Sequence, residues 1–134
     1  MSFVEIAAPM LFDQNVFDKL YSTAIKTLEQ SNPQKNTQVI IVFTSKDNEY
    51  STVISNVLSK DGSEEKMLLD VMAESKDTCI RYIMCVWHNG AIDLPSYRFR
   101  KMLVEFNPAN GDAGIFIKTR DAYGIIKLSN TLKD

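Results

Sequence analysis

One segment constrains the fold more than any other, and it is residues 79–87. These residues are apolar at almost every position, with Arg81 and Tyr82 as the exceptions. A strand that is apolar on both faces is typical of the interior of a sheet that helices cover on both sides. Residues 39–43 form a second short apolar run of the same kind. The sequence therefore predicts an α/β fold with helices on both faces of its sheet.

The segments around these two runs supply the other elements. Apolar residues recur at helical spacing from Phe17 to Leu28, and Asp13 before them is a good N-cap. Pro95 suits the first turn of a later helix. The predicted order is a helix from Asp13, strands at 39–43 and 50–58, a helix at 63–75, a strand at 79–87, a helix at 95–106, and strands at 115–117 and 123–128. Leu68, Val71 and Met72 are expected to form the apolar stripe of the second helix, which Asp61 or Ser63 would cap.

This order predicts one domain over residues 1–134, with residues 1–11 as an N-terminal arm. The expected architecture is a three-layer α/β/α fold with a mixed sheet of about five strands.

Charge and composition exclude several classes of function. The chain has 134 residues and a formal net charge of -2, with no dominant cluster of Lys and Arg. Binding to nucleic acid or to a membrane surface therefore gains no electrostatic support. The apolar runs are too short to span a bilayer, and the first residues do not resemble a secretory signal. The two cysteines, Cys79 and Cys85, give no disulfide framework. An intracellular, cytoplasmic protein without a cofactor is the expectation.

The segment at 94–106 carries a recognisable motif. It resembles the second half of the zinc nucleoside-deaminase signature, in which H-x-E is followed by P-C-x-x-C. Pro95 matches the proline of that motif, and Arg100 matches the arginine that follows the second cysteine in cytidine and blasticidin-S deaminases. Ser96 and Phe99 take the places of the two cysteines.

The first half of the signature aligns with the start of the predicted helix at 63–75. Ser63 takes the position of the histidine ligand, and Glu65 that of the catalytic glutamate. A shift of one residue would make Glu64 the match, but Glu65 places residues 67–69 over the family's apolar positions. The alternative for Glu65 is a solvated first-turn carboxylate that favours the helix dipole. The order of elements is also similar to the core of the cytidine deaminase superfamily.

The resemblance implies a degenerate member of this superfamily that lacks its zinc ligands. The zinc of the family activates a water molecule and needs three protein ligands from His and Cys. Ser63 and Ser96 are poor substitutes, and Phe99 cannot bind a metal at all. The resemblance thus implies that Glu65 is vestigial and that the Phe99 ring fills the vacated metal position. An inactive protein is expected more than an enzyme.

Two functions follow from the resemblance, and a third stays open beside them. The first is a pseudoenzyme that serves as an interaction or scaffolding module, as a homodimer or as a hetero-oligomer with a related subunit, through Tyr97 and Arg98. The second is a protein that binds a nucleoside or nucleotide in the old pocket. The third is an enzyme of another class with Glu65 or His88 as acid or base, which nothing specific supports. The pocket of the second function would use Asn56, Glu65, Pro95 and Arg100.

Plainer interpretations exist for each of these residues. Residues 95–106 are also consistent with an ordinary amphipathic helix. Arg98 and Arg100 would then balance acidic residues on a solvated surface, where ion pairs are worth little. His88 is expected in a loop before Asn89-Gly90. Buried or core positions are expected for Cys79, Cys85, Tyr82 and Trp87.

Overall fold

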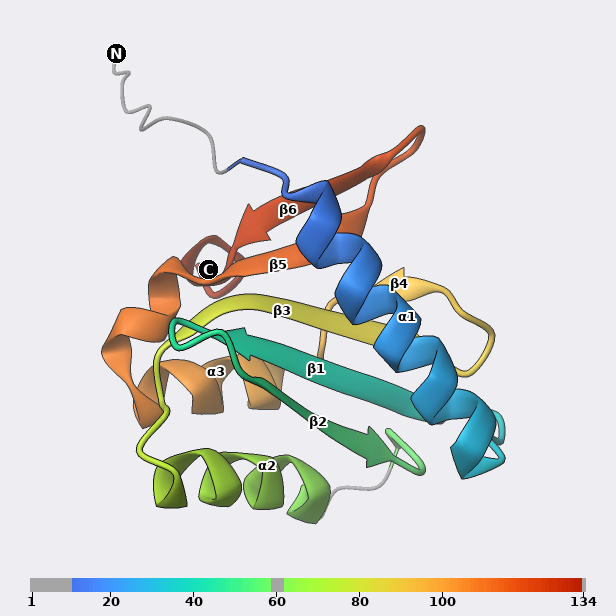
Figure 1. Cartoon of the computed structure of the whole chain (residues 1–134), viewed down its shortest axis with the longest axis horizontal. Coiled ribbons are helices and arrows are strands. Elements are labelled where there is room, and N and C mark those ends of the chain that lie inside the picture. The colour runs from blue at the N-terminus through green and yellow to red at the C-terminus, as the bar shows by residue number, and fades with distance from the viewer. Residues whose placement is uncertain (1–10, 59–61, 134) are drawn as a thin grey trace.

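The computed structural model describes residues 11–58 and 62–133, and it confirms the predicted order of elements (Figure 1). The additions to that order are a two-residue strand, β4, and two short 3-10 helices. The elements are α1 (Gln14–Ser31), β1 (Gln38–Thr44), β2 (Glu49–Ile54), α2 (Ser63–Glu74), β3 (Ile80–Trp87), β4 (Ile92–Asp93), α3 (Tyr97–Phe106), the 3-10 helix η1 (Pro108–Asp112), β5 (Gly114–Lys118), β6 (Tyr123–Lys127) and the 3-10 helix η2 (Leu128–Thr131).

The sheet is mixed, as predicted. Its strand order is β2-β1-β3-β5-β6, and β4 pairs with β3 beside this path. The β3–β5 pair is parallel, and the other pairs are antiparallel. Two parallel strands need a crossover connection, and α3 lies within the connection that joins β3 to β5.

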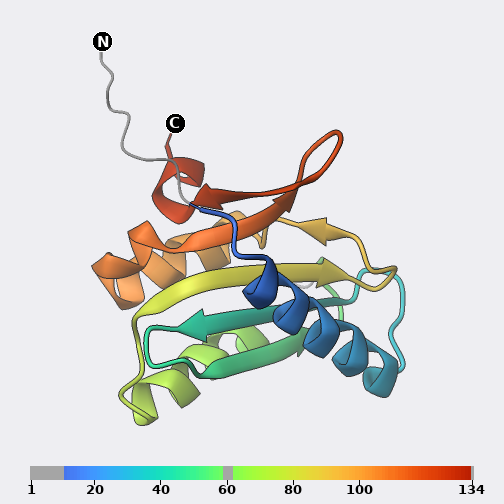
Figure 2. The ribbon, with the colours of Figure 1, turned by 45° about the horizontal axis from the view of Figure 1, so that its top comes forward.

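Two separate apolar cores confirm the three-layer architecture. Helix α1 covers one face of the sheet, and α2 and α3 cover the other (Figure 2). Side chains alternate along β1 because successive residues of a strand point to opposite faces. Val39, Ile41 and Phe43 join the core under α1, whereas Ile40 and Val42 join the core under α2 and α3.

The first helix begins where the sequence predicts. The carboxylate of Asp13 accepts a hydrogen bond of 3.1 Å from the backbone N–H of Val16, which satisfies one of the free N–H groups of the first turn. The helix ends at Ser31, and its C-cap Asn32 has a left-handed φ of 55°. Phe17, Leu20, Ala24 and Leu28 face the sheet, in agreement with the predicted periodicity.

The apolar stripe of α2 differs from the prediction. Its buried residues are Glu65, Leu68, Leu69 and Met72, which have the i, i+3, i+4, i+7 spacing of one helical face. Val71 falls off this face and is 50% exposed, so its assignment to the stripe was wrong. The helix N-cap is Gly62, with Ser63 as the first helical residue. The proposed cap Asp61 lies outside the described residues.

Two further boundaries need correction. Helix α3 begins at Tyr97 with Ser96 as its N-cap, so Pro95 precedes the helix instead of forming its first turn. Strand β2 ends at Ile54, although the apolar pattern extends to Leu58. Directly after the strand, the carbonyl of Ser55 accepts a hydrogen bond of 3.0 Å from the Thr37 hydroxyl. No helix in the two described ranges is both long and apolar enough to cross a membrane.

Candidate functional site

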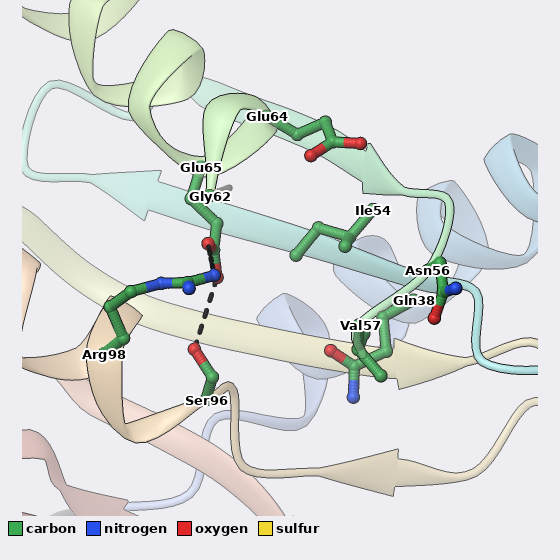
Figure 3. A pocket seen from close by; sticks show the side chains of 9 residues that line it. All are labelled: Gln38, Ile54, Asn56, Val57, Gly62, Glu64, Glu65, Ser96 and Arg98. Atoms are coloured by element: carbon green, nitrogen blue, oxygen red, sulfur yellow. Dashed lines mark hydrogen bonds and ion pairs between the residues drawn. The ribbon is translucent and has the colours of Figure 1, made fainter. Parts of the chain in front are cut away.

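The N-termini of α2 and α3 meet over one end of β1 and β2 and enclose a small cavity (Figure 3). Its volume is about 20 Å³, which is room for roughly one water molecule. The residues that line the cavity are Gln38, Ile54, Asn56, Val57, Gly62, Glu64, Glu65, Ser96 and Arg98.

Glu65 is the buried acid of this site. The residue is 2% exposed, so the interpretation as a solvated first-turn carboxylate was wrong. Its Oε1 accepts a hydrogen bond of 2.8 Å from Nη2 of Arg98, which is also an ion pair. Its Oε2 accepts a second, longer bond of 3.3 Å from the Ser96 hydroxyl. Glu65 therefore links the start of α2 to the start of α3.

Ser96 has two roles at this junction. Its Oγ accepts a hydrogen bond of 3.1 Å from the backbone N–H of Phe99 and so caps α3. Because that bond uses a lone pair, the hydroxyl hydrogen is available for Glu65. The capping bond of α3 thus orients the donor that holds the carboxylate.

Gly62 gives the Arg98 guanidinium room to reach Glu65. Its φ of 63° lies in the left-handed region, where a side chain is strained. A Cβ at this position would lie 3.2 Å from both Cζ and Nε of Arg98. The guanidinium therefore packs directly against the backbone that begins α2.

The side chains gathered here do not fit a zinc ion. Ser63 is exposed, and the ring of Phe99 is fully buried in the core under α2 and α3. In the described part of the chain, no three His, Cys, Asp or Glu side chains come together as a metal-binding group. Burial raises the pKa of the nearby Cys85 thiol far above its usual value, and the charges of Asp93 and Glu65 add to this effect. Cys85 is fully buried in the core under α2 and α3, as predicted.

Of the other residues that the sequence analysis named, some line the cavity and some do not. Asn56 lines the cavity with Glu65, whereas Pro95 and Arg100 do not. Arg100 instead donates hydrogen bonds of 2.9 Å to the carbonyls of Pro95 and Thr131. Of the two residues considered for an interface, Tyr97 is 53% exposed and lies under the Arg100 guanidinium, while Arg98 turns to Glu65.

Among the residues that line this cavity, the sequence reasoning missed Gln38 and Gly62. Gln38 opens β1, is 4% exposed and lines the cavity. Gly62 has a recognisable signal, since a glycine stands directly before the acidic start of a helix. Gln38 has no such signal, because it precedes an apolar run like many strand-flanking polar residues.

The remaining candidates lie away from the cavity. His88 is exposed in the turn after β3, as predicted. Tyr82 stacks on Phe116 with ring centroids 5.4 Å apart, in agreement with its predicted packing role. Trp87 is only half-buried, and its Nε1 donates a hydrogen bond of 3.0 Å to Asp93.

A second buried carboxylate, Asp77, follows the C-terminus of α2. Its Oδ2 accepts hydrogen bonds from the side chains of Thr44, Asn48 and Tyr50 at 2.9, 2.8 and 3.0 Å. Burial raises the pKa of Asp77, but these hydrogen bonds and the charge of Lys46 lower it by more, so the net pKa is below its usual value. Asp77 thus fastens the β1–β2 hairpin to the loop before β3.

The fold has clear counterparts among solved structures. Cytidine deaminase from Mycobacterium leprae superposes with a TM-score of 0.63 at 17% identity, over 88% of this chain and 98% of that protein. Cytidine deaminase from Mycobacterium tuberculosis gives 0.62 at 13% identity, over 88% and 94% of the two chains. The enzyme from Burkholderia pseudomallei gives 0.58 at 12% identity, over 87% and 96%. No protein-family model matches the sequence, and no curated protein sequence matches it. The chain therefore has a cytidine deaminase-like α/β fold.

Proposed function

We propose that this protein has the deaminase fold without deaminase chemistry, and that it acts as a protein-interaction module. The observation that carries the proposal is the engagement of Glu65. Its two carboxylate oxygens accept hydrogen bonds from Arg98 and Ser96 in a site that is almost closed to solvent.

Deamination by this family's chemistry needs a glutamate that moves protons between a metal-activated water and the base. Here the partner of Glu65 is a guanidinium, which does not release a proton at any ordinary pH. The hydroxyl and phenyl groups at Ser63, Ser96 and Phe99 are not the His and Cys ligands that zinc requires. These features support a site that no longer performs proton transfer.

The catalytic part of the proposal is tested by metal analysis and by ammonia release. The protein should purify without stoichiometric zinc after washing with a chelator. With cytidine, deoxycytidine, CMP or adenosine, it should release no more ammonia than a Glu65→Gln control, with or without added zinc. About one tightly held zinc per chain, or ammonia above the control, would overturn this part.

The interaction part predicts a homodimer or a hetero-oligomer with a related deaminase-fold subunit. The support is the exposure of Tyr97, since tyrosine is enriched at interface hot spots. Light scattering at micromolar concentration should give a mass above the 15.2 kDa of one chain. Tyr97→Ala should lower that mass, and this single substitution leaves the Arg98–Glu65 pair intact. A monomer that Tyr97→Ala does not change would remove the homo-oligomer.

A second candidate function is nucleoside or nucleotide binding. It is favoured by the placement of Gln38, Asn56 and Glu65 around one cavity. The cavity of about 20 Å³ is far smaller than the roughly 300–1,000 Å³ of ordinary ligand pockets. Binding would therefore require the site to open. A thermal shift with nucleosides that disappears in Asn56→Ala would support this candidate, and no shift at millimolar nucleoside would exclude it.

A further inference from the structure

We propose that Gly62, Glu65 and Ser96 form a guanidinium-binding site, that the chain fills this site with its own Arg98, and that an external planar guanidino or amidino cation can take the same place. The inference goes beyond the proposed function. It depends on the contacts of Arg98, and it holds whether or not the protein has a partner.

The shape of the site matches a flat cation. Nη2 of Arg98 donates to Oε1 of Glu65 at 2.8 Å, and the guanidinium packs against Gly62, where a Cβ would come within 3.2–3.3 Å of three of its atoms. Figure 3 shows the Arg98 side chain pointing to Glu65 beside Gly62 and Ser96. A guanidinium is planar and carries its N–H donors in that plane, so it can lie on a backbone surface and bind a carboxylate at its edge.

The charge of the site calls for a cation. The Glu65 side chain is 3% exposed, whereas its partner Arg98 is 45% exposed. A buried carboxylate without a counter-charge is unfavourable. The pair between Arg81 and Asp47 is a useful contrast, because Arg81 is also 45% exposed but its carboxylate is 73% exposed. Water can hydrate the exposed carboxylate of Asp47 when its arginine is absent. The carboxylate of Glu65 is buried, so water hydrates it less well.

Gln38 adds a second hydrogen-bonding side chain to the cavity. The residue is 4% exposed, and its side chain lines the cavity together with Glu65 (Figure 3). The Gln38 carbonyl oxygen is an acceptor for an N–H group of a guest that Glu65 holds by another N–H.

These acceptors favour a planar N–H-rich cation over other ligands. An anion would meet the carboxylates of Glu64 and Glu65, and in the described part of the chain no three His, Cys, Asp or Glu side chains come together to hold a metal ion. Ile54 and Val57 give the cavity an apolar wall that suits a short alkyl substituent. Arg98 is tethered beside the site, which gives it an effective concentration in the millimolar range or above. In the intact protein, Arg98 therefore occupies the site.

The test is chemical rescue of Arg98→Ala by methylguanidinium chloride, with sodium chloride at equal ionic strength as the reference. The melting temperature of Arg98→Ala should fall below that of the wild type. It should then rise saturably with millimolar methylguanidinium, whereas the wild type should not respond. Tetramethylammonium has no N–H donor, so it should not raise the melting temperature of Arg98→Ala.

Two variants decide whether the rescue occurs at this site. Arg98→Ala combined with Glu65→Gln should bind methylguanidinium at least tenfold more weakly than Arg98→Ala. Arg81→Ala removes an arginine that is equally exposed. Methylguanidinium should not raise the melting temperature of this variant. If Arg98→Ala does not fold alone, methylguanidinium should increase its refolding yield, and it should not do so for the double variant. No rescue, or equal rescue in these controls, would overturn the proposal.

Discussion

Removing Arg98 should destabilise the protein more than removing the charge of Glu65, although both changes break the same ion pair. The reason is the difference in burial between the two side chains, which are 45% and 3% exposed. After Glu65→Gln, the half-exposed guanidinium can be hydrated, and the new amide still accepts a bond from Ser96. After Arg98→Ala, the carboxylate stays buried, and of its two hydrogen bonds within the described residues it keeps the 3.3 Å bond from Ser96.

The expected magnitudes follow from this asymmetry. Breaking a fully buried pair by removing one partner costs about 3–5 kcal/mol. Because Arg98 is half-exposed and water can enter its place, we expect Arg98→Ala to cost about 2–4 kcal/mol. Glu65→Gln loses one charge-assisted hydrogen bond from a partner that stays hydrated, so we expect about 0.5–1.5 kcal/mol. The double variant should cost no more than Arg98→Ala alone, because the uncompensated charge is then absent.

Urea denaturation of the four proteins measures these free energies of unfolding, with fluorescence of the single tryptophan, Trp87, as the signal. Arg81→Ala is the matched control, and its exposed pair should contribute only about 0–1 kcal/mol. The reasoning is wrong if Glu65→Gln costs as much as Arg98→Ala. It is also wrong if Arg98→Ala costs no more than Arg81→Ala.

Three further predictions use the same assay. Phe99 is fully buried, so Phe99→Ala should cost about 3–5 kcal/mol through lost burial and a cavity, and a loss under about 1 kcal/mol would contradict the packing of α3. The folded-state pKa of Asp77 is lowered, so its contribution is complete above its unfolded pKa and is lost as the pH falls through the folded pKa. The difference in the free energy of unfolding between the wild type and Asp77→Ala should therefore become smaller in acid. A difference that does not change with pH would refute this. Gly62→Ala should cost about 1–3 kcal/mol from its left-handed φ and from the contact with Arg98, and it should cost less in an Arg98→Ala background, where only the strain of φ persists.

The fold was predictable because its strongest determinants are local or periodic. The apolar character of residues 79–87 on both faces indicated an interior strand, and Asp13 gave the start of α1. The errors arose where tertiary contacts decide. Val71 is apolar yet faces solvent, because the sheet meets a face of α2 that includes Glu65. Strand β4 has only two residues and depends on pairing with β3, so it leaves no periodic pattern.

The site was predictable in part for a related reason. The deaminase-like motifs brought attention to Glu65 and Ser96, and Asn56 was a candidate for the nucleoside pocket; the structure places all three at one cavity. The sequence did not reveal that Glu65 is buried, since a carboxylate in a first helical turn is usually solvated. It also did not reveal that Arg98 turns inward while Arg100 binds backbone carbonyls. The inward turn of Arg98 uses the space that Gly62 leaves beside α3.

The division of the interior into two cores has a consequence for how the protein tolerates change. The side chains under α1 and those under α2 and α3 lie on opposite faces of the sheet and share only its backbone. Effects of substitutions usually add when sites share no partners. Changes at Leu20 or Met84 should thus leave the energetics of the Glu65 site unaltered. Core residues under α1 can therefore be substituted, or redesigned for stability, without a change in the contacts of Glu65 with Ser96 and Arg98 on the opposite face.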